Sequence, residues 1–291
     1  RPAQARMGAL SRAQAGQLAT FGLARQDDRF DLALLLANEA FRKYDTFDTR
    51  AGLLGSLEVY PNLRSFLHGR RDRIWTLAVS PDGRLAAAGS DSGEILLWSL
   101  EQPSAAEKSL TAGPGAILSL AFSANGAILA AGRCTLVSDN GSCAQSEVRL
   151  WRPADGQNLG ALTEEAPSAV LSLAFSHDDR MLAAGGLGVM LWDVGSHKAV
   201  TGTIRTAPGQ MLSLAFSPDG RSLLTANKQQ FNSQAQYNPI TSTGLVQMWN
   251  VPDGSFAGKF QQCPGAWAMS VDFRDDGTPL VACDAGGLIY V

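Results

Sequence analysis

Histidine, cysteine and acidic residues are the side chains in this 291-residue sequence that could bind a metal or catalyse a reaction. His68, His177 and His197 have no carboxylate or cysteine partner at the spacing of a metal-binding or catalytic motif. Neither a Gly-x-Ser-x-Gly nucleophile elbow nor a Walker-type phosphate loop occurs. The sequence therefore predicts no catalytic residue, no cofactor and no metal site. An enzyme would need scattered groups such as Asp139, His177 and Asp272 to converge.

The cysteines leave one alternative open. They form no Cys-x-x-Cys pair, so their spacing does not indicate a zinc site. Cys134 and Cys143 bracket a short stretch and could form a disulfide across its base in an oxidising compartment. In a cytoplasmic protein, which we expect here, free thiols are the predicted state. Asp139-Asn140-Gly141 between them is typical of a turn, because a calcium site would need more oxygen ligands at regular spacing.

A seven-residue stretch, Ile74 to Ser80, occurs five times and organises most of the chain. Its copies span residues 74–80, 117–123, 170–176, 211–217 and, more loosely, 268–274. Each copy ends in a tight turn such as Ser80-Pro81-Asp82-Gly83, where proline presets φ and Asp and Gly tolerate the angles that follow. A second strand follows each turn, and in four copies a third strand ends in tryptophan, at positions 98, 151, 192 and 249.

The copies recur 43, 53, 41 and 57 residues apart, counted between residues 80, 123, 176, 217 and 274. Short strands with this period and a terminal tryptophan resemble the WD-repeat family of β-propellers, although only Trp192-Asp193 keeps the family's dipeptide. The resemblance implies a mainly β fold, a propeller over residues 62–291. Its blades are expected at about 62–103, 107–156, 158–197, 199–254 and 256–291.

The fifth blade is incomplete, since its third strand lacks a tryptophan. We therefore expect a propeller truncated from a larger ring. The alternative is a closed five-bladed ring in which residues 63–67 form the outer strand of the fifth blade, because closure is how propellers protect their sheet edges.

The first strand of each repeat alternates large and small side chains. Leu118, Leu120 and Phe122 are predicted to share one face, with Ser119 and Ala121 on the other, and the other copies repeat the arrangement. A large face can pack against the small face of the neighbouring blade and fill the gap between them. These aromatic and aliphatic residues are therefore expected to form the core.

Loop length varies at one place in the repeat. From each tryptophan to the next turn the distance is always 25 residues, so the variation lies between the second and third strands. Long insertions at 133–146 and 227–244 flank a short connection at 185–188. In a propeller these loops open on one side, named here the loop rim, where we predict partner binding; neutral drift of surface loops is the alternative. The predicted partner-binding residues are Arg133, Asp139, Asn140, Phe231, Gln234, Tyr237 and Asn238.

Residues 1–61 are predicted to form an α-helical linker, with helices at 13–24, 28–44 and 46–59. Thr46 is the expected N-cap of the third helix. The leucines of the third helix, Leu53, Leu54 and Leu57, are expected to face a neighbouring helix.

Residues 11–54 resemble the linker that precedes WD repeats in bacterial signalling ATPases with a NACHT-like nucleotide-binding module. The resemblance implies that the propeller is the sensing or partner-binding end of such a protein. Nucleotide would then bind only to an upstream module that these residues do not contain. A generic helical spacer is the alternative.

Charge gives no sign of a nucleic-acid or membrane surface, because 24 basic and 27 acidic residues leave a net charge of −3. The apolar runs also fall short of the ~20 residues that a membrane span needs. We expect a non-catalytic, cytoplasmic platform that binds a protein partner. An enzyme with its active site on the propeller rim and a purely structural scaffold are the two alternatives.

Overall fold

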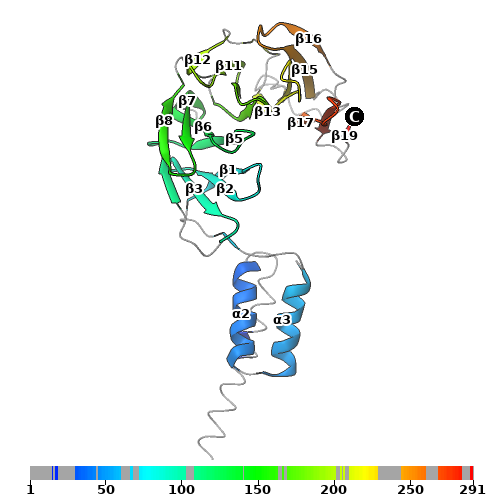
Figure 1. Ribbon diagram of the computed structural model, residues 1–291. Coiled ribbons are helices and arrows are strands. Elements are labelled where there is room, and N and C mark those ends of the chain that lie inside the picture. The colour runs from blue at the N-terminus through cyan, green and yellow to red at the C-terminus, as the bar shows by residue number, and fades with distance from the viewer. Residues whose placement is uncertain are drawn as a thin grey trace, which may run out of the picture. The chain divides into compact units, whose positions relative to one another are not determined.

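The computed structural model divides the chain into two compact units, residues 1–68 and residues 69–291 (Figure 1). The structure describes residues 15, 17–18, 30–43, 45–59, 66–67, 72–102, 108–139, 141–162, 166, 169–200, 204, 206, 210–228, 244–259, 268–283 and 289–290. In these residues the first unit is helical and the second is built from β-sheets.

Two helices in contact, α2 (Phe30–Lys43) and α3 (Phe47–Val59), are described in the first unit. Thr46 caps α3 as predicted. Its hydroxyl accepts a hydrogen bond from the Thr49 amide (3.3 Å), and the Thr49 hydroxyl accepts one from the Thr46 amide (2.9 Å). The predicted helix at 13–24 lies largely outside the described residues.

The buried positions of α2 and α3 carry small side chains. They are Ala33, Ala37, Ala40, Thr49, Gly52 and Ser56. Leu54 and Leu57 are exposed, so the prediction that they face a neighbouring helix is wrong. Small residues bring two helix axes closer than leucines would. Neither α2 nor α3, nor any other helix in the described part of the chain, is long and apolar enough to cross a membrane.

The described residues of the second unit form five antiparallel sheets, each called a blade below. Blade one contains β1 (Ile74–Val79), β2 (Leu85–Ser90), β3 (Glu94–Ser99) and β4 (Lys108–Thr111), and blade two contains β5 (Ile117–Phe122), β6 (Leu129–Val137), β7 (Cys143–Arg152) and β8 (Gln157–Ala161). Blade three contains β9 (Ser172–Phe175), β10 (Met181–Gly185), β11 (Val189–Asp193) and β12 (Lys198–Ala199). Blade four contains β13 (Gln210–Phe216), β14 (Ser222–Lys228), β15 (Gly244–Asn250) and β16 (Phe256–Lys259), and blade five contains β17 (Ala268–Phe273), β18 (Pro279–Cys283) and β19 (Ile289–Tyr290).

The blades follow one another along an arc in which the first strands β1, β5, β9, β13 and β17 lie side by side (Figure 1). This arrangement confirms the prediction of a mainly β, WD-repeat-like propeller. The predicted blade limits need one correction. The last strand of each four-stranded sheet follows the tryptophan strand, so that β4 pairs with β3 in blade one although its residues were assigned to the second blade. The predicted sequence repeats and the observed sheets are therefore offset by one strand: the strand that begins each later predicted blade completes the sheet of the blade before it.

The tight turns between the first and second strands form as predicted. In blade one, the Gly83 amide donates to the Ser80 carbonyl (2.8 Å), and the Ser80 hydroxyl donates to Asp82 Oδ1 (2.6 Å). The same hydroxyl accepts a hydrogen bond from the Leu85 amide (2.9 Å). Gly83 has φ +70°, a left-handed conformation that glycine adopts without strain. Blades three and four repeat this serine–aspartate pairing at 2.6 Å.

The turn aspartates link stability to pH. Each turn aspartate accepts a hydrogen bond from a hydroxyl of the same turn, which is the larger effect, and one from a backbone amide. These bonds hold the pKa below its ordinary value in Asp82, Asp178, Asp219 and Asp276. Because a lowered pKa in the folded state favours folding above the unfolded pKa, this contribution is lost as the pH falls through the folded pKa. We expect the free energy of unfolding, measured with urea, to fall below about pH 4. Asp219→Asn should flatten the decline; an equal slope in the variant would contradict the assignment.

Asp179 ties two blades together. It occupies the position of Gly83 in the blade-three turn, with φ +59°. Its carboxylate accepts hydrogen bonds from the backbone amides of Ala124 and Asn125 (3.0 Å for Asn125) in the turn of blade two. The contacts across the blade interface therefore offset the backbone strain of the left-handed conformation of Asp179.

Asp179→Ala is expected to lower the free energy of unfolding by about 1–2 kcal/mol, because it loses the contacts and keeps the strain. Asp179→Gly should cost less, since glycine removes the strain. Urea denaturation of both variants, with Asp275→Ala as the control in another turn, measures the difference. Equal losses for Ala and Gly would show that the backbone is not strained.

Neighbouring blades pack large faces onto small ones, as predicted, but with a different set of residues. Between blades one and two, Ile117, Leu120 and Phe122 lie in one apolar cluster with Ala78 and residues of β2 and β3. Leu118, which was predicted to belong to this face, is half-buried and outside the cluster. The reason is a shift in the pairing of β5 with β6 between residues 117 and 119, as in a β-bulge, which changes the alternation of faces. Blades three, four and five repeat the same three positions.

Glycines on the second strands make room for the next blade. A Cβ atom on Gly89 would lie 2.5 Å from Ile117 Cγ2, one on Gly132 would lie 2.6 Å from Val170 Cγ1, and one on Gly185 would lie 2.5 Å from Met211 Cγ. At the fourth interface the pair is Ala226 and Ala268, both fully buried in one cluster. Glycine thus faces a large residue at three interfaces, and alanine faces alanine at the fourth.

Candidate protein-interaction rim

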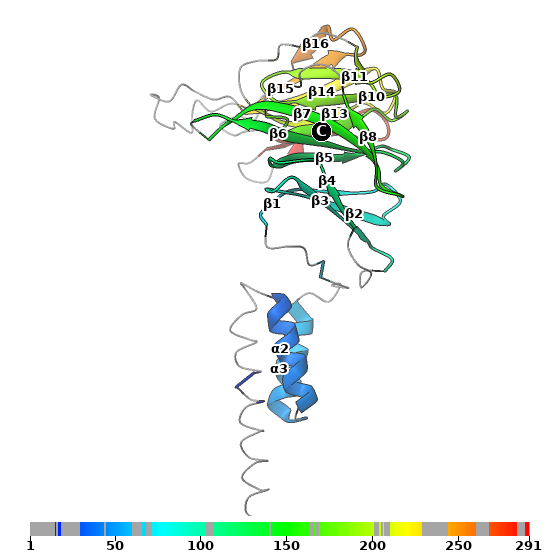
Figure 2. The same ribbon diagram turned by 90° about the vertical axis from the view of Figure 1, so that its left-hand side faces the viewer.

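The blade-two insertion forms a long hairpin. β6 and β7 pair beyond the point where β5 pairs with β6 and β8 with β7, and Figure 2 shows the two strands extending past their neighbours. At the tip, the Ser138 amide donates to the Ser142 carbonyl (2.8 Å), and the Gly141 amide donates to the Ser138 carbonyl (2.8 Å). The insertion is therefore an ordered two-stranded projection with a closed turn.

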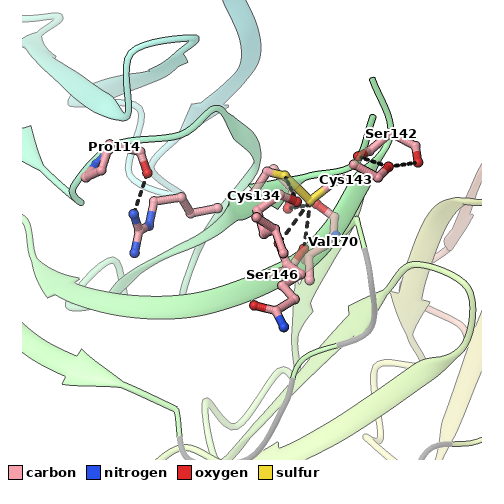
Figure 3. The surroundings of a disulfide bond; sticks show 11 residues. Pro114, Cys134, Ser142, Cys143, Ser146 and Val170 are labelled. Carbon is pink, nitrogen blue, oxygen red and sulfur yellow. Dashed lines mark hydrogen bonds between the residues drawn. A yellow bond between two sulfur atoms is a disulfide. The ribbon is translucent and has the colours of Figure 1, made fainter. Parts of the chain in front are cut away.

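A disulfide joins Cys134 and Cys143 across the hairpin, with their Cα atoms 5.7 Å apart (Figure 3). Cys283 is disulfide-bonded as well. The prediction of free thiols is wrong at these positions, because antiparallel pairing brings the two cysteine-bearing strands within bonding distance. The disulfide joins Cys134, near the base of the hairpin, to Cys143, beside its tip, and so restrains the two strands between them.

The hairpin exposes apolar side chains next to its tip. Leu136 is 50% exposed and Val137 is 58% exposed, on the strand that carries Cys134. Leu187, in the short connection of blade three, is 66% exposed. Sequence reasoning did not select these three residues. Their signal was the placement of leucine and valine inside loop segments, where polar residues are usual.

Arg133 lies at the base of the hairpin and is buried. Its guanidinium donates from Nη1 to the Pro114 carbonyl (2.6 Å) and from Nη2 to Glu147 Oε2 (3.1 Å). Arg149 donates to the other Glu147 oxygen (2.6 Å). The bond to Pro114 ties the hairpin to the connection between β4 and β5, and the two bonds to Glu147 stay within β6 and β7. The predicted partner contact of Arg133 stays a prediction, and its burial favours a structural role.

The other predicted site residues divide into two groups. Asp139 is exposed at the hairpin tip. Five lie outside the described residues: Asn140, Phe231, Gln234, Tyr237 and Asn238. The loop of blade four between residues 229 and 243 is thus not described, and partner binding at the loop rim stays a prediction.

The acidic and histidine side chains considered for catalysis lie on different elements. Asp139 is at the tip between β6 and β7, whereas His177 is in the turn between β9 and β10, at the other ends of the strands. Asp272 is exposed on β17, and its Oδ1 accepts a hydrogen bond from the Phe273 amide (2.8 Å). In the described parts of the chain, no group of three His, Cys, Asp or Glu residues could hold a metal ion.

Comparisons with known proteins agree with this fold. The family model "WD domain, G-beta repeat" matches residues 61–99 and 156–193, which contain the tryptophan strands β3 and β11. The Periodic tryptophan protein 2 homolog of Schizosaccharomyces pombe is 33% identical over 140 residues, which cover 46% of this chain and 15% of that protein.

Hydrazine synthase of Kuenenia stuttgartiensis superposes with a TM-score of 0.57 at 14% identity, over 78% of this chain and 59% of that chain. This likeness concerns the fold alone. The chain spans less than two thirds of either protein. Its repeats are similar to those of WD-repeat proteins in two blades, and all five blades follow the WD-repeat-like propeller architecture.

Proposed function

We propose that this protein is a platform for protein–protein interaction and that the hairpin of residues 133–146 is its principal contact. The observation that carries the proposal is the exposure of Leu136 and Val137 on a disulfide-restrained projection. Apolar side chains on a restrained element lose little conformational entropy when a partner binds. The WD-repeat similarity supports the same role, because such propellers commonly act as scaffolds for binding other proteins.

The Leu136→Ser/Val137→Ser double variant tests this role. We expect it to reduce recovery of a specific partner at least tenfold in quantitative affinity capture, with unchanged circular dichroism. Val200→Ser is the matched control, since Val200 is an exposed apolar residue that donates its amide to Leu191 in the middle of β11, away from the loop rim. Full recovery with the double variant would contradict the proposal. Cys134→Ser/Cys143→Ser should weaken binding less than the double variant, by loosening the hairpin.

The disulfides bear on location. Structural disulfides persist in oxidising compartments and are rare in the cytoplasm, so we propose an oxidising environment for the propeller instead of the predicted cytoplasm. Alkylation of thiols at cell lysis, followed by mass spectrometry of the peptides containing Cys134 and Cys143, tests this. A disulfide-bonded pair supports the proposal. An alkylated pair would show free thiols and would favour the predicted cytoplasmic location.

A finer hypothesis is that the propeller is the sensing end of a bacterial signalling ATPase. The resemblance of residues 11–54 to the linker of such proteins supports it, and the disulfides weigh against its cytoplasmic form. Nucleotide binding by the full natural polypeptide, altered by a partner at the loop rim, would be the expected result. A polypeptide that binds no nucleotide would exclude this hypothesis while leaving the interaction platform intact.

A further inference from the structure

The first blade presents an uncovered apolar face. Ile74, Leu77 and Val79 are exposed, with Leu77 at 73%. They occupy the positions that Ile117, Leu120 and Phe122 hold in blade two, where Leu120 is only 8% exposed because blade one covers it. The equivalents of Leu77 in blades three, four and five, Leu173, Leu214 and Val271, are buried too. This face of the first strand is therefore covered in four blades and open in blade one.

The four internal interfaces show what covers such a face. In each, the partner is the small face of the preceding blade, with Ala78, Ala121, Ala174 or Ala215 in the apolar cluster. Serine hydroxyls on that face also reach the next blade. Ser119 donates to the Val170 carbonyl (2.9 Å), and Ser213 accepts from the Val271 amide (3.1 Å). A fifth interface of this kind would need the same small inner strand.

We propose that the Ile74–Leu77–Val79 face binds a β-sheet blade that carries alanine on its inner strand and glycine on its second strand. The requirement for glycine comes from Ile74. Large residues at its position, Ile117, Val170 and Met211, each face a glycine whose added Cβ would lie 2.5–2.6 Å away. Only the alanine at position 268 faces an alanine, Ala226.

Blade five does not fit this face. Ala282 holds in blade five the position that Gly89 holds in blade one, because Ala282 pairs with Ser270 as Gly89 pairs with Thr76. If blade five packed on blade one, Ala282 would therefore face Ile74, and its Cβ would overlap the isoleucine side chain. Asp272 stands where the other blades have alanine, and its carboxylate would be buried against Leu77 without a partner. These two residues oppose closure of a five-bladed ring. They equally oppose head-to-tail packing of a second copy of the chain.

Photo-crosslinking from position 77 in the full natural polypeptide tests the proposal. Leu77 is replaced by p-benzoylphenylalanine, and the same probe at Asp272, on the opposite open face, is the control. We expect position 77 to link to a strand next to a glycine-bearing second strand, outside residues 268–283, and position 272 not to link to that strand. A link from 77 to residues 268–283 of the same or another copy, or no link at all, would overturn the proposal.

The Leu77→Asp variant provides a second measurement that does not depend on the probe. Since Leu77 is exposed, the chain should keep its circular dichroism and its unfolding midpoint. Formation of the crosslinked product, followed with the probe at Val79, should fall at least tenfold in this background. If the yield stays unchanged, or if light scattering shows a dimer of the chain that Leu77→Asp dissociates, the proposed occupant is wrong.

Discussion

Gly132→Ala is expected to lower the free energy of unfolding by about 1–3 kcal/mol, because the new methyl group would overlap Val170 of the next blade. The added Cβ would also lie 2.5 Å from the Ser119 hydroxyl, which donates across the same interface. Neighbouring backbones would have to move to relieve both contacts. Urea denaturation followed by tryptophan fluorescence measures the loss.

At the blade interfaces glycine faces a large residue, or alanine faces alanine. This pairing rule predicts that a second substitution compensates for the first. In the Gly132→Ala/Val170→Ala double variant the interface becomes alanine against alanine, as Ala226 and Ala268 are in blades four and five. We expect a coupling energy of about 0.5–3 kcal/mol that favours the double variant. Gly258→Ala is the control, since nothing lies within 4 Å of a Cβ at this position. Additive losses in the double variant would refute the rule.

The second large effect concerns Leu120 and Leu77, which hold the same position in two repeats. Leu120→Ala is expected to cost about 2–5 kcal/mol, because the deletion leaves a cavity between blades one and two. Leu77→Ala should change the free energy of unfolding by less than about 0.5 kcal/mol in the isolated chain, since Leu77 is exposed.

Parallel urea titrations of the two variants measure this contrast. A large loss for Leu77→Ala in the isolated chain would mean that its face is already covered, which contradicts the structure. A small loss for Leu120→Ala would mean that the blade interface contributes little to stability.

Local chemistry made the turns and strands predictable. Ser80, Asp82 and Gly83 act within one turn, so the residues that specify it are adjacent in sequence. The tryptophans at the ends of the third strands are likewise fixed by a recurring local pattern. The propeller followed from repeating these short signals five times.

Features that depend on pairing across strands were not predictable in the same way. The bulge at Ile117 moved Leu118 off the packed face, and the alternation of large and small residues contains no sign of it. The disulfide between Cys134 and Cys143 depends on strand register and on redox environment, and only the first is a property of the fold. The helices α2 and α3 bury alanines, threonine and serine. A prediction based on the positions of leucines does not find this buried face.

The offset between sequence period and sheet has a consequence for folding. Each described four-stranded blade consists of strands that are consecutive in the chain, so no such blade needs a distant segment to complete it. Short sequence separation between contacting residues favours rapid folding. Each blade can therefore gain its hydrogen bonds as it leaves the ribosome, before the next one is synthesised. Stability should then grow with each added interface, as in a linear array, and end blades should open first.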